Sequence, residues 1–300
     1  MLPQQSNSLV SRTSVGRFAP SPTGPLHLGS LVAAIASYMI AKQDGGRWLV
    51  RIEDLDPPRE VAGATQTILN ALEDFGLHWD GEIVYQSQRS EIYRQFLEEL
   101  KQTSIVYTCD CSRKTIDARN GGVYDGNCRR RKVSTGAAHA LRIKFDHGFD
   151  SFYDQINGPC NFYSDADKQD FIVKRRDGLF AYQLAVVADD IEQGIDHVVR
   201  GMDIIDSTPR QNYLYHCVNK ATPGYFHIPL VSDEFGVKFS KRSGSVGIDK
   251  VNATEILLAA FSHLNQPVES FLSDATIDEI INYYLEHWRI DLLKAVQPIK

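Results

Sequence analysis

Residues 17–30 read RFAPSPTGPLHLGS, and this stretch indicates the end of a strand, a turn and the start of a helix. A short strand is predicted at Val15–Phe18, and a turn rich in Pro and Gly connects it to a helix predicted over Leu28–Lys42. The first turn of such a helix offers unpaired N–H groups and a partial positive charge, and both favour phosphate. Gly29 lets a ligand approach the backbone closely, and His27 can donate a hydrogen bond to a phosphate oxygen.

Strands and helices alternate on the C-terminal side of this turn. Apolar runs predict the strands, and apolar residues at helical spacing with Gly or Pro stops predict the helices. The further predicted strands are residues 47–53, 171–176, 179–182 and 197–200. The further predicted helices are residues 60–75 with Gly76 as the stop, 90–101, one near Leu184, one after Pro209, 254–264 and 277–288. This alternation predicts an α/β fold in which helices cover a parallel sheet.

The alternation is interrupted between residues 105 and 170. Four of the five cysteines lie there, together with many basic residues and short strand-like runs, so this segment is predicted to be an inserted α+β subdomain. The predicted organisation is a polar tail (1–14), two halves of one α/β domain (15–104 and 171–245), the insertion (105–170) and C-terminal helices (246–300).

The composition excludes several classes of protein. The 300 residues are 43% hydrophobic and 23% charged, which is typical of a globular protein. No apolar run reaches the roughly 18 residues of a membrane-spanning helix, and the N-terminal tail lacks the apolar core of a signal peptide. Five cysteines without an export signal indicate a reducing compartment, so we expect a cytoplasmic protein that binds no membrane.

Basic residues gather in three places although the net charge is −6, a balance that argues against non-specific coating of nucleic acid. One run occupies residues 129–132 beside a cysteine, and another occupies residues 174–176. The third lies in residues 238–242, KFSKR. Lys238 and Lys241, three residues apart, can clamp a triphosphate and stabilise the charge that builds on a leaving pyrophosphate.

Taken together, residues 17–30 and 238–242 closely resemble the two signatures of class I aminoacyl-tRNA synthetases, usually written HIGH and KMSKS. The second signature departs from the pattern at Phe239 and Arg242 but keeps both lysines. With RIEDLD at residues 51–56, the match narrows to the glutamyl-tRNA synthetase group and extends over nearly all of residues 15–245. The resemblance implies a Rossmann-like catalytic domain that activates an amino acid with ATP and Mg²⁺.

The insertion narrows the resemblance further. Cys109, Cys111, Tyr124 and Cys128 are spaced as in the glutamyl-Q tRNA(Asp) synthetases, stand-alone paralogues of the synthetase catalytic half. In that family three cysteines and a tyrosine hold one structural zinc ion. The chain ends 58 residues after the second signature, so no anticodon-binding domain is expected.

The residues themselves predict a metal site but leave its fourth ligand open. Three thiolates in a cytosolic chain are soft ligands that suit zinc. The basic residues around them, Arg113, Lys114 and those at 129–131, favour the thiolate form. The candidates for the fourth ligand are Asp110, Tyr124, Asp125, His139 and Cys160. The choice of Tyr124 rests on the resemblance.

The resemblance also assigns the substrate pockets residue by residue. Glutamate binding falls to Arg17, Ser21, Glu53, Tyr182 and Arg200. ATP binding falls to His27, Gly29, Ser30, Lys238, Ser240 and Lys241, of which His27 and Lys241 are the expected catalytic residues. The charges of the first set agree with its ligand, because glutamate carries two carboxylates and one ammonium and needs two cations and one anion.

The activity implied by the resemblance ends with the transfer of glutamate to the queuosine base at the wobble position of tRNA(Asp). A monomer is expected. The basic insertion, with Arg130, Arg131 and the aromatic residues Phe152, Tyr153 and Tyr163, is the expected docking site of the anticodon stem-loop. Three alternatives stay open: a truncated glutamyl- or glutaminyl-tRNA charging enzyme, a small-molecule ligase of the same superfamily, and a non-catalytic tRNA-binding paralogue.

Overall fold

The computed structural model describes residues 14–43, 45–131, 133, 138–145, 147–162, 169–230 and 252–295. Through this part of the chain runs a main sheet in the order β3-β2-β1-β9-β10-β6-β7. Its strands are β1 (Val15–Phe18), β2 (Arg47–Ile52), β3 (Val84–Tyr85), β6 (Ser151–Asp154), β7 (Gly158–Asn161), β9 (His197–Gly201) and β10 (Gly224–Ile228). Neighbouring strands are parallel except β6 and β7, which form an antiparallel hairpin. The predicted parallel sheet is confirmed, and β10 is a strand that the sequence analysis did not identify.

The α-helices follow the predicted order. They are α1 (Leu28–Lys42), α2 (Ala64–Asp74), α3 (Ser90–Gln102), α4 (Arg113–Asn120), α5 (Tyr182–Gln193), α6 (Thr208–Cys217), α7 (Ala253–His263) and α8 (Ile277–His287). Helix α1 has the predicted bounds. Helix α2 begins later than predicted, because a separate 3₁₀ turn, η1 (Pro57–Arg59), and the left-handed Gly63 (φ 79°) precede it. Gly76 follows this helix with φ 70°, a conformation that glycine adopts without strain.

Helix α1 lies in the interior of the molecule and is therefore apolar around most of its circumference. Trp48 of β2 packs edge-on against Tyr38 and donates its indole N–H to Ser37 Oγ at 2.9 Å. Gly16 allows β1 to approach α1, because a Cβ at this position would lie 2.9 Å from the Cβ of Ala41. This packing holds the N-terminus of α1 at the carboxyl end of β1.

A second sheet, which is antiparallel, contains strands from both sides of residue 170, where the predicted insertion ends. It has the order β4-β5-β8, with β4 at Val106–Cys109, β5 at Ala140–Ile143 and β8 at Phe171–Lys174. Strand β8 was expected in the second half of the main domain, whereas β6 and β7, expected in the insertion, hydrogen-bond to the main sheet. The reason is apolar burial, since β8 shares one core with α3 and α5.

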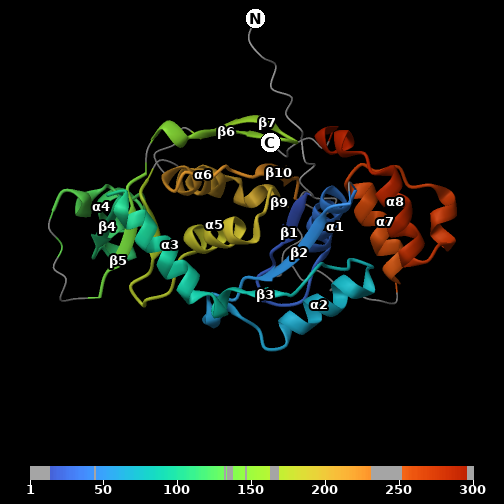
Figure 1. Cartoon of the computed structure of the whole chain (residues 1–300), viewed down its shortest axis with the longest axis horizontal. Coiled ribbons are helices and arrows are strands. Elements are labelled where there is room, and N and C mark those ends of the chain that lie inside the picture. The colour runs from blue at the N-terminus through green and yellow to red at the C-terminus, as the bar shows by residue number, and fades with distance from the viewer. Residues whose placement is uncertain are drawn as a thin grey trace, which may run out of the picture.

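Figure 1 shows the two sheets and the C-terminal helices spread along the long axis of the molecule. Helices α7 and α8 form one end and pack against α1, while α4, β4 and β5 form the opposite end. A capping box between Thr276 and Glu279 begins α8. Among the described residues, no helix is both long enough and apolar enough to cross a membrane.

Candidate active site

A cavity of about 810 Å³ lies at the carboxyl edge of the main sheet. Strands β1, β2, β9 and β10 all point their carboxyl ends toward it, and such an edge is where open α/β sheets bind ligands. Eight residues predicted from the sequence line this cavity: Arg17, Ser21, His27, Gly29, Ser30, Glu53, Tyr182 and Arg200. The structure therefore brings together predicted residues that are up to 183 positions apart.

The turn between β1 and α1 forms one wall of the cavity and is held by the segment that follows β2. Glu53 N–H donates to the Pro20 carbonyl, and Val61 N–H donates to the Pro22 carbonyl, both at 2.9 Å. His27 is the N-cap of α1, and its Nδ1 accepts a hydrogen bond from Ser30 N–H at 3.1 Å. Because Nδ1 accepts, the proton of neutral His27 is on Nε2, which lies 3.1 Å from Ser30 Oγ in this structure.

Buried charges form the floor of the site. Arg17 Nε donates to Asp190 Oδ1 at 3.3 Å, and Arg51 Nη1 donates to the same oxygen at 2.7 Å. Both arginines and Asp190 are almost completely buried. Burial by itself would raise the pKa of Asp190, but the two guanidinium groups outweigh it and hold that pKa below its ordinary value. Asp190 therefore stays ionised and fixes the position of both arginines.

Glu53 follows the last residue of β2 and is the acidic residue of the cavity wall. Its Oε1 lies 3.7 Å from Arg51 Nη2, too far for a hydrogen bond, and no donor among the described residues reaches this buried oxygen. Burial raises the pKa of Glu53 to about 7, although Arg51 and Arg17 oppose the shift. The carboxylate consequently lacks a donor that a bound cation could supply.

Arg200 and Tyr182 complete the predicted pocket. Arg200 on β9 is buried, and it donates hydrogen bonds to uncharged acceptors on His227, Gln211 and Thr208. Tyr182 begins α5, and the structure places its ring on the same cavity. Burial raises the pKa of the Tyr182 hydroxyl, so it remains protonated.

Several residues of the site were not predicted from the sequence. Asp190 pairs with both Arg17 and Arg51, while the adjacent Asp189 accepts hydrogen bonds from Arg89 Nε at 2.6 Å and Tyr93 Oη at 2.9 Å. The sequence did contain a signal for these two residues. In AVVADD, residues 185–190, two acids stand side by side after an apolar run in a predicted helix. Such acids are buried only when they are paired.

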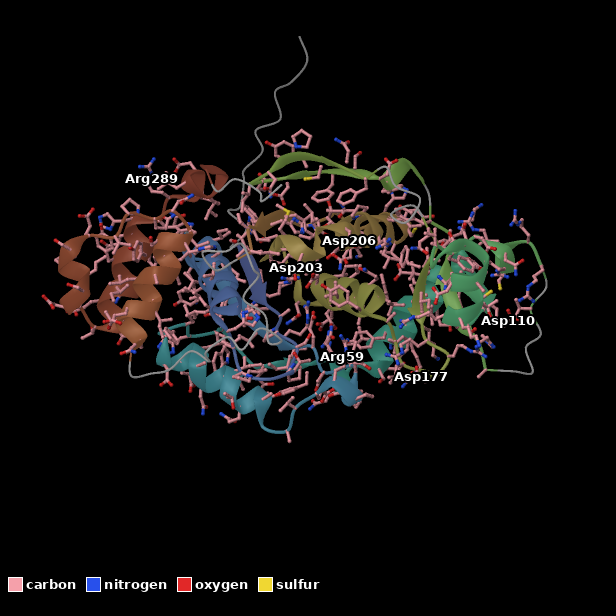
Figure 2. The ribbon with its side chains drawn as sticks, turned by 180° about the vertical axis from the view of Figure 1, so that it is seen from behind. Arg59, Asp110, Asp177, Asp203, Asp206 and Arg289 are labelled. Carbon is pink, nitrogen blue, oxygen red and sulfur yellow. The ribbon has the colours of Figure 1, made fainter. Side chains whose placement is uncertain are left out.

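Residues from segments that are distant in the sequence lie at the rim of the cavity. Arg59 of η1 and Asp203 line the cavity, and Figure 2 shows both near the middle of the molecule. Asp56 accepts a hydrogen bond from Arg59 and another from Arg175 Nη1, the latter at 3.1 Å. Arg175 also donates to Asp177 in the turn that follows β8, so this turn is anchored to the rim.

The three ATP-site residues predicted in the second signature, Lys238, Ser240 and Lys241, lie outside the described residues. Tyr163, predicted as an RNA contact, also lies outside them. Two other predicted RNA contacts differ from each other. Tyr153 is exposed on β6, whereas Phe152 is partly buried and packs against Tyr225 and His227.

Three cysteines predicted as metal ligands lie together at the β4 end of the molecule. The Sγ atoms of Cys109, Cys111 and Cys128 all lie within 4.8 Å of one another. Three arginines donate to them: Arg142 Nε to Cys109 at 3.4 Å, Arg119 Nη2 to Cys111 at 3.2 Å, and Arg131 Nη2 to Cys128 at 3.5 Å. Guanidinium donors stabilise thiolates, so the donor set fits a soft divalent ion such as zinc.

Two candidates for a fourth donor lie beside the cysteines. Tyr124 is buried with them, and its hydroxyl accepts a hydrogen bond from Cys128 N–H at 2.9 Å. Asp110 Oδ1 accepts from Cys128 Sγ at 3.4 Å and is also paired with Arg131. Among the described residues, neither His139 nor Cys160 belongs to the cysteine group, and Cys160 lies on β7 of the main sheet.

The basic run beside these cysteines is largely engaged within the protein. Arg129 pairs with the buried Asp170, and Arg131 pairs with Asp110. Arg130 donates only to the Asp125 carbonyl, at 3.4 Å, among the contacts that the structure gives. Of the three arginines in this run, Arg130 therefore has the charge that a phosphate could use.

Comparison with known proteins places the chain in a family. The family model of the catalytic domain of class I tRNA synthetases (E and Q) matches residues 14–283. Glutamyl-Q tRNA(Asp) synthetase of Vibrio vulnificus (strain YJ016) is 45% identical over 285 residues, 95% of this chain and 93% of that protein. The protein of the same name from Vibrio parahaemolyticus is 47% identical over 281 residues, 94% of each chain.

A solved structure resembles the fold as well. Glutamate-tRNA synthetase from Elizabethkingia anophelis superposes with a TM-score of 0.79 at 25% sequence identity. The superposition covers 94% of this chain and 66% of that one, so the present chain spans about two thirds of its length. The predicted α/β fold with a mostly parallel sheet is thus the class I synthetase fold.

Proposed function

Because this chain belongs to the catalytic-domain family of class I glutamyl- and glutaminyl-tRNA synthetases, and within it to the relatives named glutamyl-Q tRNA(Asp) synthetase, we propose that it activates L-glutamate with ATP and transfers it to queuosine in tRNA(Asp). The observation that carries the first half is the charge pattern of one cavity. Two buried arginines, Arg17 and Arg200, and one largely buried acid, Glu53, line it together with the N-terminus of α1.

This charge pattern matches glutamate. Arg17 and Arg200 supply cations for the two carboxylates of the substrate, and guanidinium groups bind carboxylates in two-point contacts. The ammonium group donates to Glu53, whose Oε1 has no donor among the described residues. Binding the ammonium lowers the pKa of Glu53 from about 7, so substrate and ionised carboxylate stabilise each other.

The activation step needs no nucleophilic side chain. An α-carboxylate oxygen of glutamate attacks the α-phosphorus of ATP, a new O–P bond forms, and the bond to pyrophosphate breaks. His27 Nε2–H and the first-turn N–H groups of α1 stabilise the negative charge that develops on the phosphate oxygens. A class I synthetase uses ATP with Mg²⁺, which the phosphates and water would hold. The lysines at 238 and 241 complete this set by sequence prediction alone.

In the transfer step, queuosine is the proposed nucleophile. A hydroxyl of the cyclopentene diol of queuosine attacks the carbonyl carbon of glutamyl-adenylate, an ester forms, and AMP leaves. The support for this acceptor is the identity of 45–47% with relatives that carry that name. A diol offers the same nucleophile as the ribose of a tRNA 3′ end, so a class I site suits it chemically.

One structural zinc ion completes the proposal. Cys109, Cys111, Cys128 and Tyr124 would hold it, and the arginines that donate to the three sulfur atoms support thiolate ligands. Held there, the ion would rigidify the β4 end of the molecule, where we propose that Arg130 contacts the anticodon stem-loop.

Pyrophosphate exchange tests the activation half without any RNA. Labelled pyrophosphate, ATP and Mg²⁺ are offered with glutamate, glutamine or aspartate in turn. We expect exchange with glutamate, loss of exchange in Glu53→Ala, and full exchange in Glu98→Gln, a matched exposed acid on α3. Exchange with another amino acid, or none with any, would contradict the proposed substrate.

A further inference from the structure

Arg200 is held in place by neutral groups alone among the contacts that the structure gives. Its Nε donates to His227 Nε2 at 2.9 Å, its Nη1 to Gln211 Oε1 at 2.8 Å, and its Nη2 to Thr208 Oγ1 at 2.6 Å. Arginine has five N–H donors, so these bonds fix the plane of the guanidinium group and leave donors for a ligand. Its positive charge stays available to an anion in the cavity that it lines.

The contact between Arg200 and His227 determines the tautomer of the histidine. A guanidinium group donates only, so His227 Nε2 carries a lone pair and the ring proton of the neutral imidazole is on Nδ1. His227 is completely buried, and its surroundings favour this neutral form. Burial, together with Arg200 on β9 and Arg17 on β1, lowers its pKa against the opposing effect of Asp154 on β6.

Asp154 holds the other side of the ring. Its Oδ2 accepts from His227 Nδ1–H at 2.7 Å and from His227 N–H at 3.0 Å. Its Oδ1 accepts from the backbone N–H groups of Ile156 and Asn157 and from Asn157 Nδ2. Asp154 is completely buried as well, so these donors keep the carboxylate in one orientation.

We propose that Asp154 and His227 are positioning residues for substrate recognition: Asp154 fixes the Nδ1–H tautomer of His227, and His227 Nε2 then holds Arg200 in the orientation that receives a glutamate carboxylate. This inference rests on the proposed glutamate site and adds two residues to it. Neither touches the cavity, and both act through Arg200. The arrangement favours an anionic ligand, because a negatively charged partner for Arg200 would cancel the charge that attracts the carboxylate.

Three substitutions separate this role from a structural one. In Asp154→Asn the amide can donate to His227 Nδ1, which moves the ring proton to Nε2, where it faces the Arg200 Nε–H. His227→Leu removes the acceptor altogether. His227→Gln supplies a carbonyl oxygen near the position of Nε2 and should rescue the site. All three are measured by pyrophosphate exchange, with KM determined separately for glutamate and for ATP.

We expect the KM for glutamate to rise about tenfold or more in Asp154→Asn and His227→Leu, because a buried hydrogen bond to a charged group is lost. His227→Gln should recover most of this loss, and the KM for ATP should stay nearly unchanged in all three. Thermal unfolding shows whether each variant folds. Gln266→Leu removes a buried polar side chain that donates to the Arg289 carbonyl beyond α8, and we expect lower stability with an unchanged KM for glutamate.

Two outcomes would overturn the inference. Folded Asp154→Asn and His227→Leu with the wild-type KM for glutamate would show that Arg200 needs no such support. Equal rises in the KM values for glutamate and ATP would indicate a general structural defect. If the wild-type protein itself shows no exchange with glutamate, the proposed function fails, and this result is distinct from either of these.

Discussion

At the scale of single residues, Glu53 controls the charge of the proposed glutamate pocket. Its neighbours Arg17 and Arg51 are held by Asp190, so their attraction does not outweigh the cost of burying the Glu53 carboxylate. The result is a pKa of about 7 in the free protein, within the range where enzyme assays are run. A group that titrates there makes substrate binding depend on pH.

We expect the KM for glutamate to rise as the pH falls below about 7, because protonated Glu53 loses the charge that pairs with the substrate ammonium. The measurement is pyrophosphate exchange at a series of pH values from acidic to alkaline. Glu53→Gln should show a high KM throughout and no rise in this range. A wild-type KM that stays constant through the acidic side of pH 7 would contradict the assignment.

Ionised Glu53 should favour glutamate binding but lower the stability of the folded protein. Because the folded state raises the pKa of Glu53 above its unfolded value of 4.5, the folded state binds the proton more tightly. Its ionisation therefore destabilises the protein as the pH rises from about 4.5 through 7. Urea unfolding at pH 8 should show Glu53→Gln more stable than wild type by up to about 3 kcal/mol, with little difference near pH 5. A less stable variant at pH 8 would show that the ionised carboxylate is satisfied.

At the scale of elements, the N-terminus of α1 combines a structural cap with the donor that we propose for the phosphate oxygens. His27 caps the helix through Nδ1, and the same ring faces the cavity. Asparagine is a strong N-cap residue but cannot place a donor where His27 Nε2 lies. The two roles can therefore be separated by substitution.

His27→Ala should destabilise the protein by about 1 kcal/mol because the cap is lost, and it should also slow glutamate activation. His27→Asn should restore the stability but not the rate. Urea unfolding and pyrophosphate exchange measure the two effects on the same samples. Recovery of the full rate in His27→Asn would show that the histidine serves only as a cap.

The three cysteines at the β4 end have a proposed metal-binding role that can also be tested separately from catalysis. We expect about one zinc ion per chain by elemental analysis, as four tetrahedral ligands imply. Cys128→Ser should lose the metal and weaken transfer to RNA while exchange with glutamate continues. Cys160→Ser, in the main sheet, is the matched control and should retain the metal. Full metal content in Cys128→Ser, or loss in Cys160→Ser, would contradict the ligand set.

At the scale of the whole molecule, the parallel sheet explains which features could be predicted from the sequence. Arg17, His27 and Glu53 follow or end strands that local periodicity identifies, and the sheet gathers them at one edge. Asp154 and His227 carry no local signal, because their contact depends on the pairing of β6 with β10 across more than 70 residues.

The same long-range pairing explains why the expected division of the chain differs from the sheets. Local patterns predicted the segment that forms β8, but not its partner, because β8 joins β5 through a core shared with α3 and α5. The cysteines were predicted from their spacing, from the preference of zinc for thiolates and from the family resemblance. The arginines that donate to them could not be fully predicted, since Arg119 and Arg142 reach the sulfur atoms from α4 and β5.

The proposed reaction ends with the transfer of glutamate to a modified base. Labelled glutamate, ATP and Mg²⁺, offered with two matched preparations of tRNA(Asp), test this transfer directly. One preparation carries queuosine at the wobble position and the other lacks it. We expect label on the queuosine-bearing tRNA alone, since the diol is the proposed nucleophile. Label on tRNA(Glu), or on neither preparation of tRNA(Asp), would contradict the acceptor.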